Sequence, residues 1–199
     1  MRVSGGLSPA PLFFHYVCFT RGVLCMRKFR KAKKPDMDGI NLLVSILVCY
    51  PEIGMVSYEP KEDALHLSFG LKAVPAHESY EAAARFIEES IMTYHNLEGF
   101  SHAQIEISLE AQENAAFLHI VRDVFTLSRG EIALVTTLMR EHFGAILLRD
   151  EEKGMPDEEQ DNAVQEEAID HMIGSLKINH VRDRMIGIRE EGRVMVFNK

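Results

Sequence analysis

A chain of 199 residues with 46% hydrophobic and 26% charged residues has the length and composition of one globular domain, or of one domain with appendages. Its net charge of −8 combines two unlike parts: residues 1–35 carry eight Lys and Arg without any acid, and residues 36–199 carry fourteen Lys and Arg and all thirty acids, a net charge of −16. An acidic body repels phosphate backbones, so we expect no nucleic-acid binding by the folded part of the chain.

The three cysteines, Cys18, Cys25 and Cys49, all lie in the first quarter of the chain. Their odd number and the lack of CxxC spacing argue against a disulfide framework and against a structural zinc site. We therefore expect a reducing, cytoplasmic environment, and nothing in the sequence calls for a cofactor.

Residues 1–36 differ from the rest of the chain, with an apolar run over 12–19 and a dense basic block over 27–34. Three interpretations compete: a secretory signal, a basic arm that touches nucleic acid or an anionic membrane surface, and a flexible or spurious extension. A signal is disfavoured because the apolar run leads into basic residues instead of a small-residue cleavage site. We favour the extension, with translation starting at Met26 or Met37, because globular patterning begins only after Met37.

The segment 40–50 is almost entirely apolar, and it is far shorter than the roughly 20 residues that span a bilayer. Asp38 can cap a helix here and Pro51 can end it, so we predict a short helix that is buried on most sides. A strand is the alternative, and a helix that faces a partner subunit would show the same pattern.

The best-patterned stretch, residues 53–109, predicts three strands and a helix. Apolar residues alternate with polar ones over 65–71, as in a strand with one buried face, and the polar turn 60–63 joins this strand to a β-prone run at 55–58. The same alternation over 105–109 predicts a third strand.

A helix is expected between the second and third of these strands, over 77–97, with Gly99 as its end. Such a helix can cover one face of the strands, which favours a sheet and a layer of helices as the simplest core. Residues spaced by three and four positions form its apolar stripe: Tyr80, Ala84, Ile87, Ile91 and Tyr94.

The next part of the chain repeats this order of elements. Residues 117–125 are β-rich without clean alternation, so we expect a strand with both faces covered. Ser128 and Glu131 form a capping box, in which the Ser hydroxyl accepts from the Glu amide and the Glu carboxylate reaches back. The helix that they open should end at Gly144, and a short strand should follow at 145–148. The strand-strand-helix order over 53–97 and 102–143 fits either pseudo-symmetry or ordinary α+β alternation.

The C-terminal part begins with an acidic, apolar-poor stretch that we interpret as an exposed linker. An amphipathic helix follows, and then a hairpin with Gly192 in its turn, which either extends the main sheet or forms a separate flap. The sequence thus predicts an α+β protein with a predominantly antiparallel sheet, covered by three to four helices in two layers. We divide it into an N-terminal extension (1–36), a core (37–150), a linker (151–160) and a helix-hairpin unit (161–199).

No motif in the sequence identifies a chemistry. GxxxxGK[ST], GxGxxG and GxSxG are all absent, and Cys49 lies in an apolar run where a thiol is usually inert. Glu167 and His171 are four residues apart on a predicted helix and are weak metal-ligand candidates, but two ligands do not make a site, and an exposed Glu–His pair explains them better. His66, His102 and His119 fall on predicted strands, and they meet only if those strands are adjacent.

One local excess of cations surrounds the final hairpin, and it is our best candidate for a binding site. These arginines can hold an anionic ligand, a phosphate or an acidic strip of a partner, although Asp183, Glu190 and Glu191 next to them can also neutralise them. The cluster consists of Arg182, Arg184, Arg189 and Arg193.

Two functional hypotheses follow from the sequence. The first is a non-enzymatic regulatory or assembly module that acts through protein contacts, including self-association, because the segment 40–50 is more apolar than a small domain needs. The second is a protein or enzyme for a small anionic ligand, which uses the arginine cluster with His or Glu partners.

Overall fold

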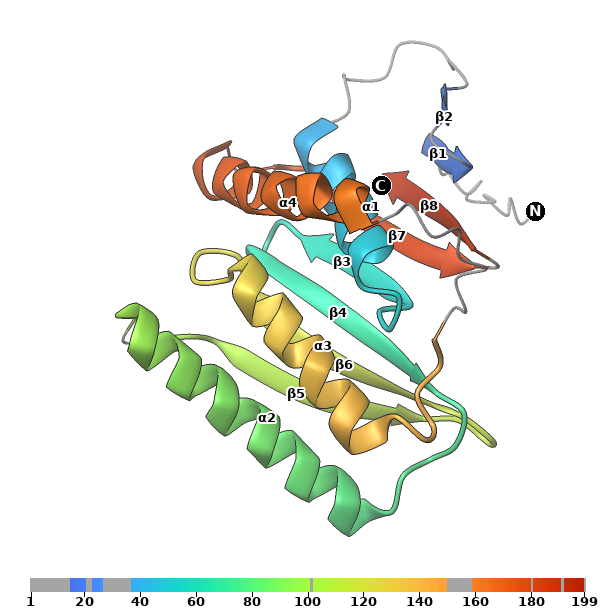
Figure 1. Ribbon diagram of the computed structural model, residues 1–199, viewed down its shortest axis with the longest axis vertical. Helices are drawn as coiled ribbons and strands as arrows, with labels where there is room; N and C mark the ends of the chain where they lie inside the picture. Colours follow the sequence, from blue (N-terminus) through green and yellow to red (C-terminus); the bar gives the residue numbers. More distant parts are fainter. Residues whose placement is uncertain are drawn as a thin grey trace, which may run out of the picture.

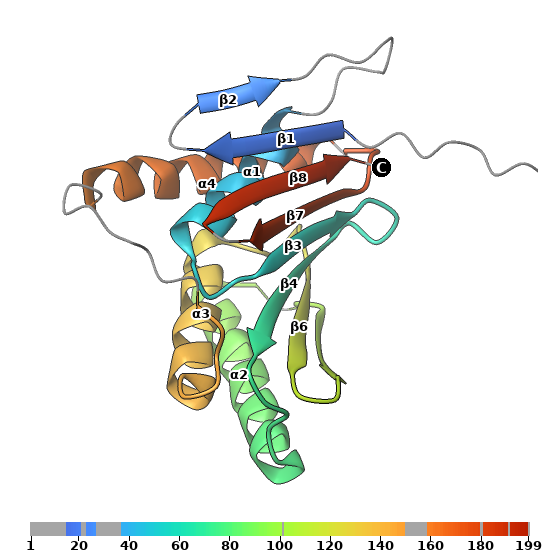
Figure 2. The same cartoon turned by 90° about the vertical axis from the view of Figure 1, so that its right-hand side faces the viewer.

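The computed structural model describes residues 15–20, 23–26, 37–100, 102–149, 159–179, 181–190 and 192–198. These residues form a predominantly antiparallel sheet with four helices, which is the predicted α+β class. Figures 1 and 2 show two layers: all four helices lie on one side of the sheet, and no helix of the described residues covers the other side.

The strands are joined in one continuous sheet, in the order β2-β1-β8-β7-β3-β4-β6-β5, and all neighbouring pairs are antiparallel. The final hairpin extends the main sheet, because β7 pairs with β3. Two strands that the sequence analysis did not anticipate, β1 and β2, continue the sheet beyond β8. The bounds are β1 His15–Thr20, β2 Val23–Met26, β3 Met55–Glu59, β4 Ala64–Leu71, β5 Ile105–Ala111, β6 Ala116–Asp123, β7 Met185–Glu190 and β8 Arg193–Asn198.

Each hairpin of the main sheet follows a helix along the chain. The helices are α1 (Met37–Cys49), α2 (His77–Glu98), α3 (Arg129–Phe143) and α4 (Glu159–Asn179). In sequence order α1 precedes β3–β4, α2 precedes β5–β6 and α4 precedes β7–β8, and α3 is the additional helix. The strand-strand-helix order predicted twice is therefore present, as β3-β4-α2 and β5-β6-α3.

Helix α1 confirms the predicted short helix, and it is enclosed within the chain. It lies between α4 and the strands β7, β8 and β3. This packing explains the apolar excess of the segment 40–50 without a partner subunit. The side chains that α1 buries are Ile40, Leu42, Leu43, Ile46 and Leu47.

Alternation fixes which side of each strand faces the helices. On β4 the predicted apolar set, Leu65, Leu67, Phe69 and Leu71, is fully buried. The expectation that both faces of the next strand are covered is wrong: burial on β6 alternates strictly between buried and half-buried side chains. The segment predicted as a strand at 145–148 forms only an isolated bridge, between Leu71 and Leu147.

Helix ends mostly follow the predicted signals. Gly99 ends α2 with φ of 83°, a left-handed conformation that glycine adopts at little cost. The buried stripe of α2 is turned slightly from the predicted one, because Ala83 and His95 are buried where Ala84 and Tyr94 were expected. Helix α4 begins at Glu159, and the preceding residues of the predicted linker lie outside the described part of the chain.

The contact between α1 and the sheet depends on a glycine in β7. A Cβ atom on Gly187 would lie 2.9 Å from Leu47 Cδ1 and 3.3 Å from Leu43 Cβ. Because both neighbours belong to the fully packed face of α1, any side chain at this position pushes the helix away from the sheet.

We therefore expect Gly187→Val to lower the free energy of unfolding by about 1–3 kcal/mol, through overpacking between α1 and β7. Gly174→Ala in α4 is the matched control, because no heavy atom lies within 4 Å of the added Cβ. Alanine there should leave stability unchanged or raise it by about 0.5–1 kcal/mol. Urea denaturation measures both, and equal effects of the two substitutions would contradict the packing argument.

Candidate functional site

The helix-free face of the sheet, which we call the open face, changes character across its width. On β7 and β8 it presents half-buried apolar side chains, Ile186, Ile188, Met195 and Phe197. On β4 and β6 the same face carries the polar side chains His66, Ser68 and His119, together with Phe117. The boundary between apolar and polar halves is where a ligand with both kinds of surface would fit.

A cavity of about 540 Å³ lies at this boundary, near the start of β3, and we call it the sheet-face cavity. Five segments meet there: the α1–β3 loop, the end of β4, the β5–β6 hairpin, the segment after α3 and the end of β7. Its lining combines apolar with ionisable side chains: Pro51, Gly54, Met55, Ser68, Gly70, Glu110, Gln112, Phe117, His119, Leu148, Arg149, Ile188 and Arg189.

Pairing of the strands places a serine, a histidine and a glutamate in a line on the polar half. Ser68 and His119 are directly opposite on β4 and β6, and Ser68 Oγ lies 2.8 Å from His119 Nδ1. Glu110 is the diagonal neighbour on β5, with its Oε2 atom 3.6 Å from His119 Nε2. The ring of Phe117, two residues along β6, stacks on the His119 ring with centroids 6.4 Å apart. The imidazole is therefore held on three sides.

This line of residues differs from a nucleophilic triad in two respects. Ser68 is only 2% exposed, so its hydroxyl is not presented to a substrate. The gap of 3.6 Å between His119 and Glu110 is an ion-pair distance, longer than a hydrogen bond that would orient a catalytic base. Ser68 thus positions the imidazole, and the second ring nitrogen lies beside the Glu110 carboxylate.

A glycine in β4 brings the segment after α3 to the cavity. The Gly70 carbonyl accepts from the Leu148 amide at 2.8 Å, and the Lys72 amide donates to the Ile146 carbonyl at 2.7 Å. A Cβ on Gly70 would be 2.9 Å from Leu148 Cδ1, so a larger residue would displace that side chain. Gly70 thereby allows Leu148, and Arg149 after it, to line the cavity.

The guanidinium group of Arg149 forms an ion pair with a buried carboxylate. Glu52, which is 3% exposed, has its Oε1 atom 3.2 Å from Arg149 Nη2 and 3.6 Å from Arg140 Nε. Among the residues that line the cavity, the two arginines Arg149 and Arg189 outnumber the one carboxylate, Glu110. The lining is thus weakly cationic within an acidic chain.

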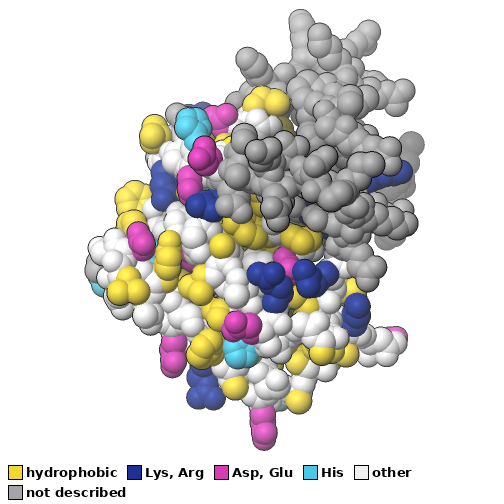
Figure 3. Space-filling model, viewed as in Figure 1, with side chains coloured by type: hydrophobic (Ala, Val, Ile, Leu, Met, Phe, Trp, Pro, Cys, Tyr) yellow, Lys and Arg dark blue, Asp and Glu magenta, His cyan; other side chains and the backbone are white. Residues whose placement is uncertain are grey.

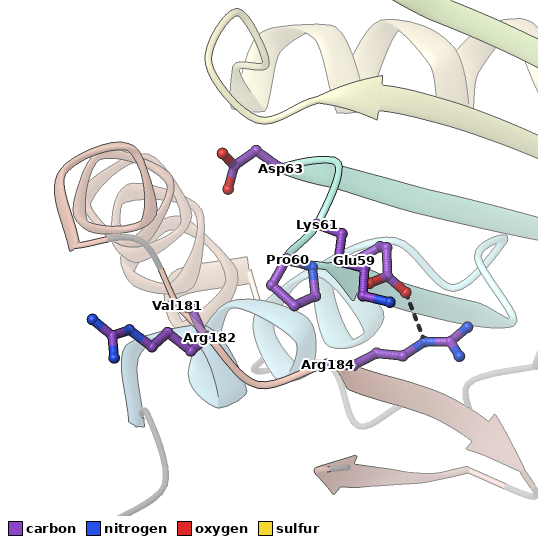
Figure 4. A pocket seen from close by; sticks show the side chains of 7 residues that line it. All are labelled: Glu59, Pro60, Lys61, Asp63, Val181, Arg182 and Arg184. Carbon is purple, nitrogen blue, oxygen red and sulfur yellow. Dashed lines mark ion pairs between the residues drawn. The ribbon is translucent and has the colours of Figure 1, made fainter.

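A second cavity, of about 590 Å³, lies at the opposite end of β3, β4 and β7, and we call it the turn-end cavity. Figure 4 shows the Arg182 side chain pointing away from Arg184, with Lys61 between them, and Arg184 paired with Glu59. The Nε atom of Arg184 is 3.3 Å from Glu59 Oε2. The lining consists of Glu59, Pro60, Lys61, Asp63, Val181, Arg182 and Arg184.

The arginine cluster predicted from the sequence is therefore divided. Arg182 and Arg184 precede β7 and line the turn-end cavity, whereas Arg189, near the other end of β7, lines the sheet-face cavity. Arg193 is exposed on β8 and lies opposite Glu190 in the hairpin. A strand rises about 3.3 Å per residue, so β7 separates what the sequence places together.

The predicted metal candidates do not converge. Glu167 and His171 are both exposed on α4, and within the described residues no three His, Cys, Asp or Glu side chains are grouped to hold a metal ion. His66 and His119 lie on adjacent strands and share the open face, but His102 precedes β5 instead of lying on a strand. In the described part of the chain, no helix has the length and apolarity needed to cross a membrane.

On the helix side, side chains of both charges are interspersed with hydrophobic ones, as Figure 3 shows. The ionisable cluster on this side is buried beneath the surface, between β6, α2 and α3. Arg122 is fully buried, and its guanidinium group donates to both carboxylate oxygens of Glu131 and to the Gln104 carbonyl. His95 Nε2 is 2.6 Å from Glu131 Oε2. Half of the predicted capping box is confirmed, because Ser128 accepts from the Glu131 amide, but the Glu131 carboxylate bonds Arg122 and His95 instead of reaching back.

This buried network holds elements together, and its members line neither the sheet-face cavity nor the second cavity described above. Asp123 continues it: its carboxylate accepts from Arg122, from the Gln104 amide and from both the amide and hydroxyl of Thr126. Burial alone would raise the pKa of Asp123, but the hydrogen bonds from Thr126, Gln104 and Arg122 outweigh it and lower that pKa below 3.8. The sequence does not predict this network, because a single Arg in a β-rich run has no spacing pattern that would link it to Glu131 or His95.

Searches of protein-family models, of curated proteins and of solved structures give no match to this chain.

The buried pair between Arg122 and Glu131 is expected to be costly to break on one side only. Arg122→Met should lower the free energy of unfolding by about 3–5 kcal/mol, because Glu131 keeps its charge without its main partner. The double variant Arg122→Met, Glu131→Leu should be more stable than the single one by about 1–3 kcal/mol, since no lone carboxylate remains. Urea denaturation measures the stability of both variants. A double variant that is less stable than Arg122→Met would contradict the explanation by an unpaired buried carboxylate.

The lowered pKa of Asp123 makes stability depend on acid pH. The unfolded chain takes up this proton near the ordinary value of 3.8, before the folded chain does, so the contribution is complete above that pH and is lost as the pH falls through the folded pKa. We expect Asp123→Asn to flatten the fall of the free energy of unfolding below about pH 4. Glu113→Gln, in the exposed β5–β6 turn, controls for the loss of one charge; an equal flattening in both variants would contradict the assignment.

Proposed function

We propose that this protein binds a small organic anion, a carboxylate or a phosphate with an apolar body, in the sheet-face cavity. The observation that carries the proposal is the convergence of His119, Arg149 and Arg189 with apolar walls in one cavity of about 540 Å³. Ligand cavities typically combine apolar walls with a few polar groups that fix the orientation of the ligand.

The lining offers both donors for an oxyanion and apolar surface for the rest of a ligand. Arg149 and His119 come from the segment after α3 and from β6, and they offer N–H donors to an oxyanion. Met55 and Ile188 are cross-strand neighbours on β3 and β7, and they offer an apolar wall for the remainder of the ligand. The proposal therefore moves the predicted anion site from the four hairpin arginines to Arg189 together with Arg149.

Binding is favoured over catalysis because the most nucleophile-like group is not accessible. Ser68 is buried and its hydroxyl is engaged by His119, so the pair orients a ring that can contact a ligand. A binding role, unlike catalysis, does not require an accessible nucleophile in this cavity.

The proposal is tested by thermal shift of the 199-residue chain with phosphate, sugar phosphates, nucleotides and aliphatic and aromatic carboxylates, each compared with its neutral ester or amide. A ligand present at 100 times its Kd stabilises the folded state by about 2.7 kcal/mol, a clear rise in Tm. His119→Ala and Arg149→Ala should each weaken the affinity for the best anion at least about tenfold, or about 1.4 kcal/mol.

Arg140→Ala is the matched control, because Arg140 shares the Glu52 carboxylate with Arg149 but does not line the cavity. The affinity of the Arg140→Ala variant for the same anion should stay within about twofold of that of the unmodified chain, a difference near 0.4 kcal/mol. The proposal fails if no anion raises Tm more than its neutral analogue, or if all three variants bind alike.

Regulation or assembly through protein contacts is a second candidate function. The original reason for it no longer applies, since the segment 40–50 is covered by α4 and the sheet. A different observation favours it: Leu97, Phe125 and Ile178 are 82%, 75% and 78% exposed.

The cytoplasmic location inferred from the cysteines stays a prediction.

A further inference from the structure

Two large apolar side chains protrude from the end of the molecule that carries the turn-end cavity. Phe125 follows β6 and is 75% exposed, and Ile178 lies in the last turn of α4 and is 78% exposed. Single exposed apolar residues are common, but two bulky ones on neighbouring segments offer an apolar patch that gains free energy when it is covered.

Hydrogen bonds bring the segments that carry these two residues together. Lys177 Nζ, next to Ile178, donates to the Leu127 carbonyl at 3.0 Å, and the Val124 amide, next to Phe125, donates to the Asp63 carbonyl at 2.8 Å. Tyr58 Oη donates to the Val181 carbonyl at 3.4 Å. The end of α4, the β6–α3 loop and the β3–β4 turn thus come together, as they do in Figure 1.

The segments that carry the exposed residues are anchored by buried side chains. Val124, Leu127 and Val181, each close in sequence to an exposed residue of the patch, are at most 6% exposed. Phe125 is therefore presented by an anchored loop and Ile178 by the last turn of α4, and a partner need not order the backbone there on binding. We call this area the turn-end surface: Phe125, Ile178 and the lining of the turn-end cavity.

The same surface carries exposed cations. Both of its acids are engaged inside the chain: Glu59 pairs with Arg184, and Asp63 Oδ1 accepts from Tyr58 Oη at 2.9 Å. Among the described residues neither Lys61 nor Arg182 forms an ion pair, and both side chains are exposed. Figure 4 places Lys61 in the middle of the cavity and Arg182 at its side toward α4.

We propose that the turn-end surface binds an acidic amphipathic segment of a partner protein. The apolar side chains of such a segment would cover Phe125 and Ile178, and its carboxylates would pair with Lys61 and Arg182. Residues 36–199 carry a net charge of −16, so an acidic partner is attracted only where exposed cations such as Lys61 and Arg182 lie. A second copy of this chain, with its net charge of −8, is disfavoured by the same repulsion.

The inference is tested by fluorescence anisotropy with the 199-residue chain and a labelled helical peptide that has Glu on one face and Leu and Phe on the other. Two further peptides replace Glu by Lys or the apolar residues by Ser. We expect measurable binding of the acidic amphipathic peptide only, and a fall in affinity with added salt, because the exposed ion pairs are screened.

Variants separate the two contributions of the surface. Phe125→Ser with Ile178→Ser, and separately Arg182→Glu, should each weaken binding at least about tenfold. Val74→Ser and Arg193→Glu are the matched controls, an exposed apolar residue and an exposed arginine elsewhere, and they should bind the peptide like the unmodified chain. Unchanged Tm values verify folding.

Three results would overturn the inference. Equal binding of the Glu and Lys peptides would remove the role of charge, and equal binding by the surface variants and the controls would place the contact elsewhere. Light scattering that shows an oligomer of the unmodified chain, lost in the Phe125→Ser, Ile178→Ser variant, would assign the surface to a second copy of the chain.

Discussion

The covering of the sheet on one side only is the constraint on which the other features depend. Four helices pack against one face, and the fully buried residues of β4 and β6 point toward them. Strand geometry sends every second side chain to the other face, where no helix of the described residues lies. Cross-strand pairs on that face, such as Ser68 with His119, therefore become possible binding groups instead of core.

The two faces place charge in opposite ways. On the helix side, Arg122 meets Glu131 and His95 between layers, where water is excluded and each charge must be satisfied inside the protein. On the open face and at the strand ends, arginines line cavities and keep donors near solvent. The first arrangement specifies how α2, α3 and β6 fit together, and the second is available to ligands.

The fold class, the β3–β4 hairpin, α1, the end of α2 at Gly99 and the Ser128 cap were all predictable, because each has a local signal: alternation, spacing by three and four, or a capping residue. The site was not. Arg182 and Arg189 look like one cluster in the sequence, yet β7 carries them to different cavities. Ser68, His119 and Arg149 are far apart along the chain, and no local pattern links them.

The sequence by itself predicted the four helices, the hairpins from residue 53 onward and the buried face of each strand with clean alternation, because backbone periodicity converts residue spacing directly into direction. It also favoured a short, mostly buried helix over 40–50, with a strand as the alternative. Only the tertiary structure decided that α4 and β7, not a partner subunit, cover α1, and that His119 and Arg149 meet in one cavity. The reason is that the order of strands in a sheet, here β7 beside β3 and β6 beside β4, is set by packing between distant segments, which leaves no mark on neighbouring residues.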